Sequence, residues 1–176
     1  MASSENLKIA LLGLGRAGKF HIQSIQSIPG ISLRCVVDVD ESLARRLAKE
    51  LECDYSTDAE GPLGQADVDA VIVASPTHEH YGQISAALKA GKAVFTEKPL
   101  GSSLEEIDSC FGLAKRSELP LFVGFNRRFD PSFSSLARGV KEGQVGVLQM
   151  LRVTSRDSPL PTMDYIKTSH GIFHDC

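Results

Sequence analysis

The apolar run LKIALL at residues 7–12 is followed directly by the glycine-rich stretch GLGRAGKF at residues 13–20. A continuous apolar run that ends in glycine is typical of a strand buried on both faces. Apolar side chains then recur at helical spacing, at Ala17, Phe20, Ile25 and Ile28. A buried strand, a glycine turn and a helix in this order predict an α/β fold with the turn at the start of its first crossover.

The same alternation of strand and helix patterns continues to about residue 125. Further strands are expected at 31–37, near 53–56, and at 69–75, 93–97 and 121–125. Helices are expected at 41–51, after the fourth strand to about 90, and after the fifth to about 116, with Asp40 as one cap and Ser102 with Glu105 as a capping box. Helices between buried strands predict a parallel sheet with helices on both faces, a Rossmann dinucleotide-binding domain over residues 1–125.

The pattern changes after residue 125. Asp130 is a candidate cap for a helix from Pro131 to about Gly143, and the partly alternating stretch at 145–156 predicts an antiparallel strand with one exposed face. One such strand cannot build a core. Residues 126–176 are therefore expected to be the beginning of an α+β substrate and oligomerisation domain, in a fragment, a truncated isoform or a chain completed by a partner.

Charge and composition exclude several classes of protein. The net charge of −3 provides no basic surface for nucleic acid or an anionic membrane. No apolar run approaches the ~20 residues that span a bilayer, and the N-terminus does not resemble a signal peptide. The four cysteines are widely spaced, which favours buried thiols in a reducing cytoplasm over a disulfide or a zinc site.

The glycine-rich stretch fits two phosphate-binding loops. A nucleoside triphosphate loop requires Ser or Thr after the lysine to ligate Mg²⁺, and Phe20 stands there. In a dinucleotide turn, Gly13 permits the tight turn, Gly15 the approach of the pyrophosphate and Gly18 the packing of the helix. The N–H groups of the first helical residues, Arg16 and Ala17, would then face the pyrophosphate.

An acid is expected about 20 residues after such a turn, at the end of the second strand. Asp38 occupies this position. A carboxylate there accepts hydrogen bonds from the adenosine ribose and repels a 2′-phosphate, which favours NAD over NADP. Arg16, Arg45 and Arg46 leave NADP open.

Three further motifs fall where strands of the predicted sheet end: ASPTHEH at 74–80, TEKPL at 96–100 and GFNRRFDP at 124–131. Together with GLGRAG they resemble the sugar and inositol dehydrogenases, the Gfo/Idh/MocA family of NAD(P)-dependent oxidoreductases. The resemblance runs from about Leu7 to Cys176, and within the family it is strongest to the inositol dehydrogenases. It implies hydride transfer between nicotinamide and a secondary alcohol of a polyol or sugar.

The resemblance also implies roles for individual residues. Lys98 would contact both the substrate hydroxyl and the coenzyme, Glu97 would brace the site or contact the coenzyme, and the Lys98–Pro99 bond would be cis. The nicotinamide side of the coenzyme would lie against Ser75, Pro76, Thr77 and His80. A metal site at His78 and His80 is not expected, because histidines two apart at a helix start diverge and the sequence shows no third ligand.

Arg127 and Arg128 would hydrogen-bond substrate hydroxyls or stabilise the domain junction. Asp175 matches the aspartate of the family's D-x-x-x-H motif, which hydrogen-bonds the reacting polyol. The family's D-x-x-x-H motif places its catalytic histidine four residues after Asp175, beyond Cys176. We therefore expect this chain to bind NAD but to turn over poorly, since a general base typically contributes about 10²–10⁴-fold. The resemblance implies a homo-oligomer for the full-length form. A catalytically inactive NAD-binding module, acting with a full-length partner, is the alternative.

Overall fold

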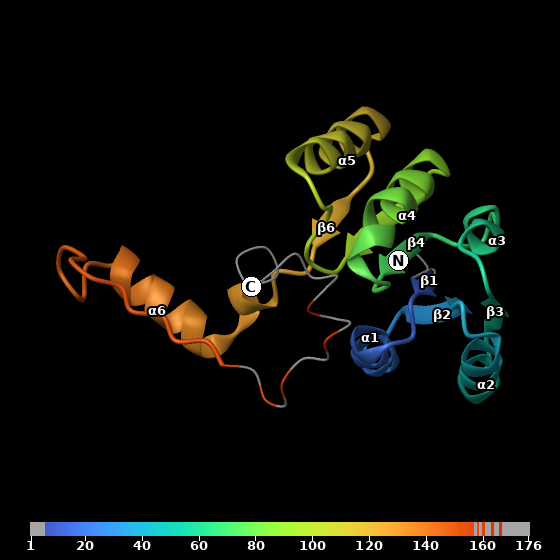
Figure 1. Cartoon of the computed structure of the whole chain (residues 1–176), viewed down its shortest axis with the longest axis horizontal. Coiled ribbons are helices and arrows are strands. Elements are labelled where there is room, and N and C mark those ends of the chain that lie inside the picture. Colours follow the sequence, from blue (N-terminus) through green and yellow to red (C-terminus); the bar gives the residue numbers. More distant parts are fainter. Residues whose placement is uncertain (1–5, 157, 159, 161–162, 164–165, 167–176) are drawn as a thin grey trace, which may run out of the picture. The chain divides into compact units, whose positions relative to one another are not determined.

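The computed structural model describes residues 6–156, 158, 160, 163 and 166. Its centre is a six-stranded sheet in the order β3-β2-β1-β4-β5-β6, in which all neighbouring strands are parallel (Figure 1). The strands are β1 (Leu7–Leu12), β2 (Ile31–Val37), β3 (Asp54–Ser56), β4 (Ala70–Val73), β5 (Ala93–Thr96) and β6 (Leu121–Val123). The strand order reverses between β1 and β4, where ligands gather in open α/β sheets. The predicted Rossmann fold is confirmed.

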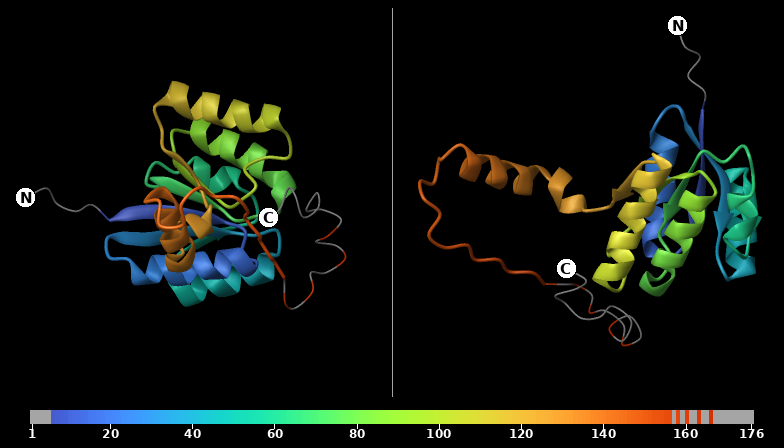
Figure 2. Two further views of the ribbon diagram at one scale, coloured as in Figure 1. Left: turned by 90° about the vertical axis from the view of Figure 1, so that its left-hand side faces the viewer. Right: turned by 90° about the horizontal axis from the view of Figure 1, so that it is seen from above.

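Helices cover the sheet from both sides, with α1 and α2 on one face and α4 and α5 on the other (Figure 2). Their bounds are α1 (Arg16–Ser27), α2 (Glu41–Leu51), α3 (Glu60–Leu63), α4 (Thr77–Lys89) and α5 (Leu104–Ser117). Right-handed crossovers that run in opposite directions from β1 and from β4 place their helices on opposite faces. In the described part of the chain, no helix combines the length and apolar composition needed to cross a bilayer.

Two buried clusters form the core, one on each face of the sheet. Successive residues of β1 supply both, because side chains alternate along a strand: Leu12 joins the cluster under α4 and α5, and Leu11 joins the one under α1 and α2. The first contains Ile84 and the second Ala44, all fully buried. Burial on both faces explains why the strands read as continuous apolar runs.

Two local predictions were wrong in detail. The cap of α5 lies one residue later than expected: Ser103 Oγ accepts from the Glu106 N–H, and the Glu106 carboxylate accepts from the Ser102 N–H. The buried face of α1 contains Gly18, Ile22 and Ile25, while Phe20 is 61% exposed. The reason is that Gly18 lies against the main chain of the glycine turn, which sets the rotation of the helix.

The chain divides into two compact units at the Gly124–Phe125 bond. Unit 1 comprises the described residues up to Gly124, and unit 2 those from Phe125 onwards. Unit 2 contains a 3₁₀ turn, η1 (Asn126–Phe129), and α6 (Pro131–Lys141). Asp130 caps α6 as predicted, accepting from the backbone N–H groups of Ser132 and Phe133.

The antiparallel strand predicted at residues 145–156 is not formed. These residues are all exposed and adopt turns and irregular structure. A strand satisfies its backbone groups by pairing with a neighbour, and the described residues of unit 2 contain no other strand. Alternating apolar residues alone were therefore insufficient to produce a strand here.

Candidate functional site

The glycine turn after β1 is shaped by two close main-chain contacts. Gly13 has φ +91°, and a Cβ there would lie 2.6 Å from Ala74 O and from Ser75 N. A Cβ on Gly18 would overlap the carbonyl oxygen of Gly13. At Gly15, by contrast, an added Cβ would meet no atom of the described residues within 4 Å. Two of the glycines are thus required for packing, and the middle one borders open space.

The amino end of α1 begins at this open space. Gly15 is the N-cap and supplies no side-chain hydrogen bond, and the first turn carries no acidic residue. The first N–H groups of a helix have no intrahelical acceptor, and the helix dipole adds partial positive charge. The amides of Arg16 and Ala17 lie in this turn, so the end of α1 suits an anion.

Asp38 follows β2 and lies beside the turn. Its Oδ2 accepts from the Leu14 N–H at 2.8 Å, and its Oδ1 accepts from the Asp40 N–H at 3.0 Å. The two bonds orient the carboxylate, and each oxygen retains a second lone pair. The carboxylate is therefore held in place and still able to accept from hydroxyl groups.

The loop after β4 contains Ser75, Pro76 and Thr77. Ser75 Oγ donates to Gln83 Oε1 at 2.7 Å, and Pro76 is the N-cap of α4. Ser75 and Thr77 are partly exposed and Pro76 is exposed, so the loop borders solvent at the carboxyl end of the sheet.

His80, one turn into α4, joins two loops. Its side chain is buried, with Nδ1 2.6 Å from Pro99 O and Nε2 2.9 Å from Ser75 O. The ring therefore links the loop after β4 to the loop after β5. His78 on the same helix is exposed, so the two histidines face different surroundings. The predicted contact of His80 with the coenzyme stays a prediction.

The loop after β5 contains Glu97 and Lys98. Its main chain is tied to β4, because the Glu97 N–H donates to Val73 O at 2.8 Å. The Lys98–Pro99 bond is cis, as the family resemblance implied. Lys98 is partly exposed at the carboxyl edge of the sheet.

Glu97 binds a residue that sequence reasoning missed. Its Oε1 lies 2.8 Å from His21 Nε2 on α1. The hydrogen bond from His21 lowers the pKa of the Glu97 carboxyl below its ordinary value, against the opposing effect of burial, and the Lys98 charge lowers it further. The sequence offered one signal for His21: it is a polar residue three positions after Gly18, on the inward face of α1.

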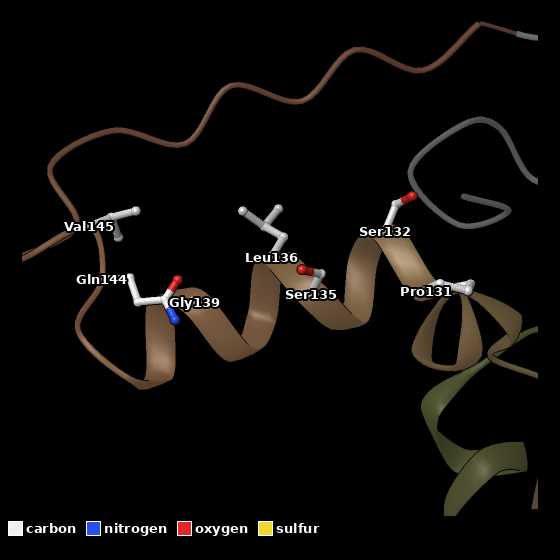
Figure 3. A pocket seen from close by; sticks show the side chains of 7 residues that line it. All are labelled: Pro131, Ser132, Ser135, Leu136, Gly139, Gln144 and Val145. Atoms are coloured by element: carbon white, nitrogen blue, oxygen red, sulfur yellow. The ribbon is translucent and has the colours of Figure 1, made fainter.

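Unit 2 contains one further candidate. Arg127 is exposed, and its guanidinium lies over the Phe133 ring, 5.4 Å from the centroid. A hollow of about 540 Å³ beside α6 is lined by apolar and uncharged polar residues, among them Leu136 and Val145 (Figure 3). Among the described residues, those that line the hollow carry no ionisable side chain. Asp175 lies outside the described residues.

The site residues of unit 1 follow four adjacent strands, β2, β1, β4 and β5, and meet at one edge of the sheet. A family model described as an oxidoreductase family with an NAD-binding Rossmann fold, Gfo/Idh/MocA, matches residues 7–125. The chain belongs to this family. The family resemblance read from the four motifs is thereby confirmed.

Several relatives of the chain are named inositol dehydrogenases. The chain is 37% identical over 169 residues to inositol 2-dehydrogenase of Rhizobium meliloti and 38% identical over 170 residues to myo-inositol 2-dehydrogenase of Thermotoga maritima, each over 96% of this chain. The structure of scyllo-inositol dehydrogenase from Lactobacillus casei with bound NAD(H) and scyllo-inositol has a TM-score of 0.75 at 35% identity, covering 80% of this chain and 42% of that one. The chain spans about half the length of the curated relatives it matches, 51% of each of these two.

Proposed function

We propose that the chain binds NAD across the carboxyl edge of unit 1 and serves hydride transfer in a polyol dehydrogenase. The observation that carries this proposal is the open space at Gly15, between Gly13 and Gly18, at which an added Cβ would clash with the main chain. A coenzyme pyrophosphate fits that space, because it is bordered by the amino end of α1 and by the oriented carboxylate of Asp38.

In this proposal each strand end binds one part of the coenzyme. The amides of Arg16 and Ala17 hold the pyrophosphate, and Asp38 accepts from the adenosine ribose and repels a 2′-phosphate, so NAD is preferred to NADP. The nicotinamide half lies toward the ends of β4 and β5, because the strand order places them on the other side of β1 from β2. Its neighbours there are Ser75, Pro76, Thr77, Glu97 and Lys98.

The proposed substrate is an inositol-like polyol or a sugar, supported by the inositol dehydrogenases among the relatives. Bound NAD supplies the hydride acceptor. The Lys98 ammonium holds and polarises the reacting hydroxyl oxygen, while Arg127 and Asp175 hydrogen-bond the polyol. Hydride transfer releases a hydroxyl proton. In this proposal the Lys98 side chain relays that proton to a general base.

The first test measures coenzyme binding. The purified chain is titrated with NADH, NADPH and ADP-ribose by calorimetry, and then assayed for myo-inositol-dependent NADH production. We expect NADH and ADP-ribose to bind, and NADPH to bind about tenfold more weakly, which corresponds to ~1.4 kcal/mol. Binding without turnover favours a catalytically inactive NAD-binding module, whereas turnover favours the dehydrogenase. A folded sample with no affinity for either coenzyme overturns the proposal.

A variant pair tests the role of Asp38. Asp38→Ala removes the carboxylate that faces the proposed ribose site, so the preference for NADH over NADPH is expected to disappear. Glu52→Gln is the matched control, because it removes one negative charge at the opposite end of α2, where Glu52 is exposed. If both variants change coenzyme preference equally, net charge and not the ribose contact explains the preference.

A further inference from the structure

His21 lies on the second turn of α1, and its side chain contacts the end of β5. Its Nε2 is 2.8 Å from Glu97 Oε1, and its ring meets that of Phe95 edge-on, with centroids 5.2 Å apart and an angle of 70°. The side chains of His21 and Glu97 are only 16% and 27% exposed. A hydrogen bond to a carboxylate is stronger in such partly dry surroundings than at an open surface.

The Glu97 carboxylate is also influenced by the residue that follows it. The backbone and the charge of Lys98 lower the pKa of this carboxyl, in addition to the larger effect of the His21 bond. The main chain of Glu97 is anchored separately, through its bond to Val73 O in β4. His21 therefore holds the side chain of Glu97, and Lys98 follows Glu97 directly in the chain.

The helix that carries His21 is also the helix of the glycine turn. His21 is three residues after Gly18, so the two share the inward side of α1. Gly18 fixes that side against the main chain of Gly13. The position of His21 is consequently tied to the turn, and the position of the Lys98 main chain is tied to His21.

We propose that His21 is a positioning residue for the nicotinamide half of the coenzyme site. Through Glu97, it sets the place of Lys98 relative to the turn at the amino end of α1. The inference rests on the proposed function, in which that turn binds the pyrophosphate and Lys98 lies beside the nicotinamide. His21 itself contacts neither the coenzyme nor the substrate in this account.

The alternative is that His21 only packs against Phe95. Two variants separate these roles. His21→Phe keeps an aromatic ring against Phe95 and removes the donor to Glu97. His21→Gln removes the ring and keeps an N–H donor at about the reach of Nε2. A positioning role predicts that the Gln variant resembles the wild type, whereas a packing role predicts that the Phe variant does.

The test compares two ligands by calorimetry. NADH occupies both halves of the proposed site, whereas ADP-ribose has the pyrophosphate and lacks nicotinamide. We expect His21→Phe to weaken NADH binding ~10-fold and ADP-ribose binding less than about twofold, and His21→Gln to stay within ~3-fold of the wild type for both ligands. Thermal melting of each variant checks that unit 1 remains folded. His21→Met, with a flexible side chain that adapts to irregular spaces, replaces His21→Phe if that variant does not fold.

Each result bears on one of the two proposals. Equal losses for NADH and ADP-ribose in His21→Phe overturn the inference, because the variant would then act on the turn or on the whole fold. Unchanged NADH affinity in His21→Phe overturns it as well. If the wild type binds neither ligand, the proposed function has failed instead. Selective loss of NADH affinity, restored by Gln, supports a positioning role.

Discussion

Unit 1 and unit 2 use apolar residues differently. In unit 1 they form two buried clusters on the faces of the sheet. The described residues of unit 2 include large apolar side chains as well, among them Phe133 and Leu136, but none of these residues is buried. Both units form capped helices, so helix signals in the sequence act locally, while burial depends on partners elsewhere in the chain.

The same difference in burial distinguishes the candidate site residues of unit 1 from Arg127 in unit 2. The glycine turn, Asp38 and the loop with Lys98 lie on a sheet that buries its own core, so their mutual distances follow from unit 1 alone. Arg127 lies in unit 2 and is held by a ring contact with Phe133. Coenzyme binding is accordingly the activity that this structure supports most directly.

The first prediction, which has the largest expected effect, concerns the core of unit 1. Leu12→Ala removes a fully buried side chain from the cluster under α4 and α5. We expect a loss of about 3 kcal/mol in the free energy of unfolding, within the usual range for buried leucines. The matched change Leu136→Ala, at a side chain that is 53% exposed in unit 2, is expected to cost less than about 0.5 kcal/mol. Urea unfolding followed by circular dichroism measures both, and equal losses would contradict the comparison.

The second prediction sharpens the comparison within unit 1, between glycines that pack and a glycine that borders the site. Gly18→Ala is expected to destabilise unit 1 by about 2–3 kcal/mol, because its Cβ overlaps the main chain of Gly13. Gly15→Ala has room for its Cβ, so the unfolding midpoint should stay within about 0.5 kcal/mol of the wild type. NADH affinity should nevertheless fall in Gly15→Ala, because the methyl group occupies the proposed pyrophosphate space. Calorimetry that shows unchanged affinity would argue against that placement.

Sequence reasoning succeeded where a feature depends on neighbours along the chain. Apolar runs located the strands of unit 1, and residue spacing located Asp38 and the turn. The cap of α6 at Asp130 likewise needed only the next residues. The family resemblance added the cis bond before Pro99, which no local pattern requires.

Sequence reasoning failed where a feature depends on the rotation of a helix or on a distant partner. The exposure of Phe20 follows from the contact between Gly18 and Gly13, which sets the inward face of α1. The bond between His21 and Glu97 joins residues 76 positions apart. The absent strand at residues 145–156 shows the same limit, because pairing requires a second strand.

The third prediction concerns pH and the bond between His21 and Glu97. The folded protein lowers the pKa of Glu97 below its ordinary value of 4.5, so this carboxylate stabilises unit 1 fully above that value. Its contribution is lost as the pH falls through the lowered pKa. Hydrogen bonds to charged groups contribute ~1.5–3 kcal/mol in general. Because the Glu97 side chain is 27% exposed, solvent screening brings the expected effect to the lower end of this range, below that of the glycine variant.

Urea unfolding at several pH values between about 3 and 7 measures this effect as the difference between the wild type and Glu97→Gln. The wild type should be the more stable above the ordinary pKa, and the difference should shrink at acid pH. Glu105→Gln is the control for a carboxyl whose pKa is lowered at an exposed position. The Glu105 carboxyl has a lowered pKa and lies on the exposed first turn of α5. A difference that grows toward acid pH would contradict the assignment.

The smallest expected effect compares the same helix cap in the two units. Asp40→Ala removes the acceptor for the Leu43 N–H, and Asp130→Ala removes the acceptor for the Ser132 and Phe133 N–H groups. Loss of an N-cap typically costs about 1 kcal/mol. Because α2 buries Ala44 and Ala48, we expect Asp40→Ala to lower the unfolding free energy of unit 1 by about this amount.

The described residues of α6 include no buried side chain, and helices of this length are marginal without tertiary contacts. Asp130→Ala should therefore reduce the helical population of residues 131–141 and leave the unfolding of unit 1 unchanged. Amide exchange followed by NMR resolves the two responses residue by residue. If Asp130→Ala lowered the stability of unit 1 as much as Asp40→Ala does, the cap would contribute beyond its own helix. The contrast between a unit with its own core and a unit of local structure would then be wrong.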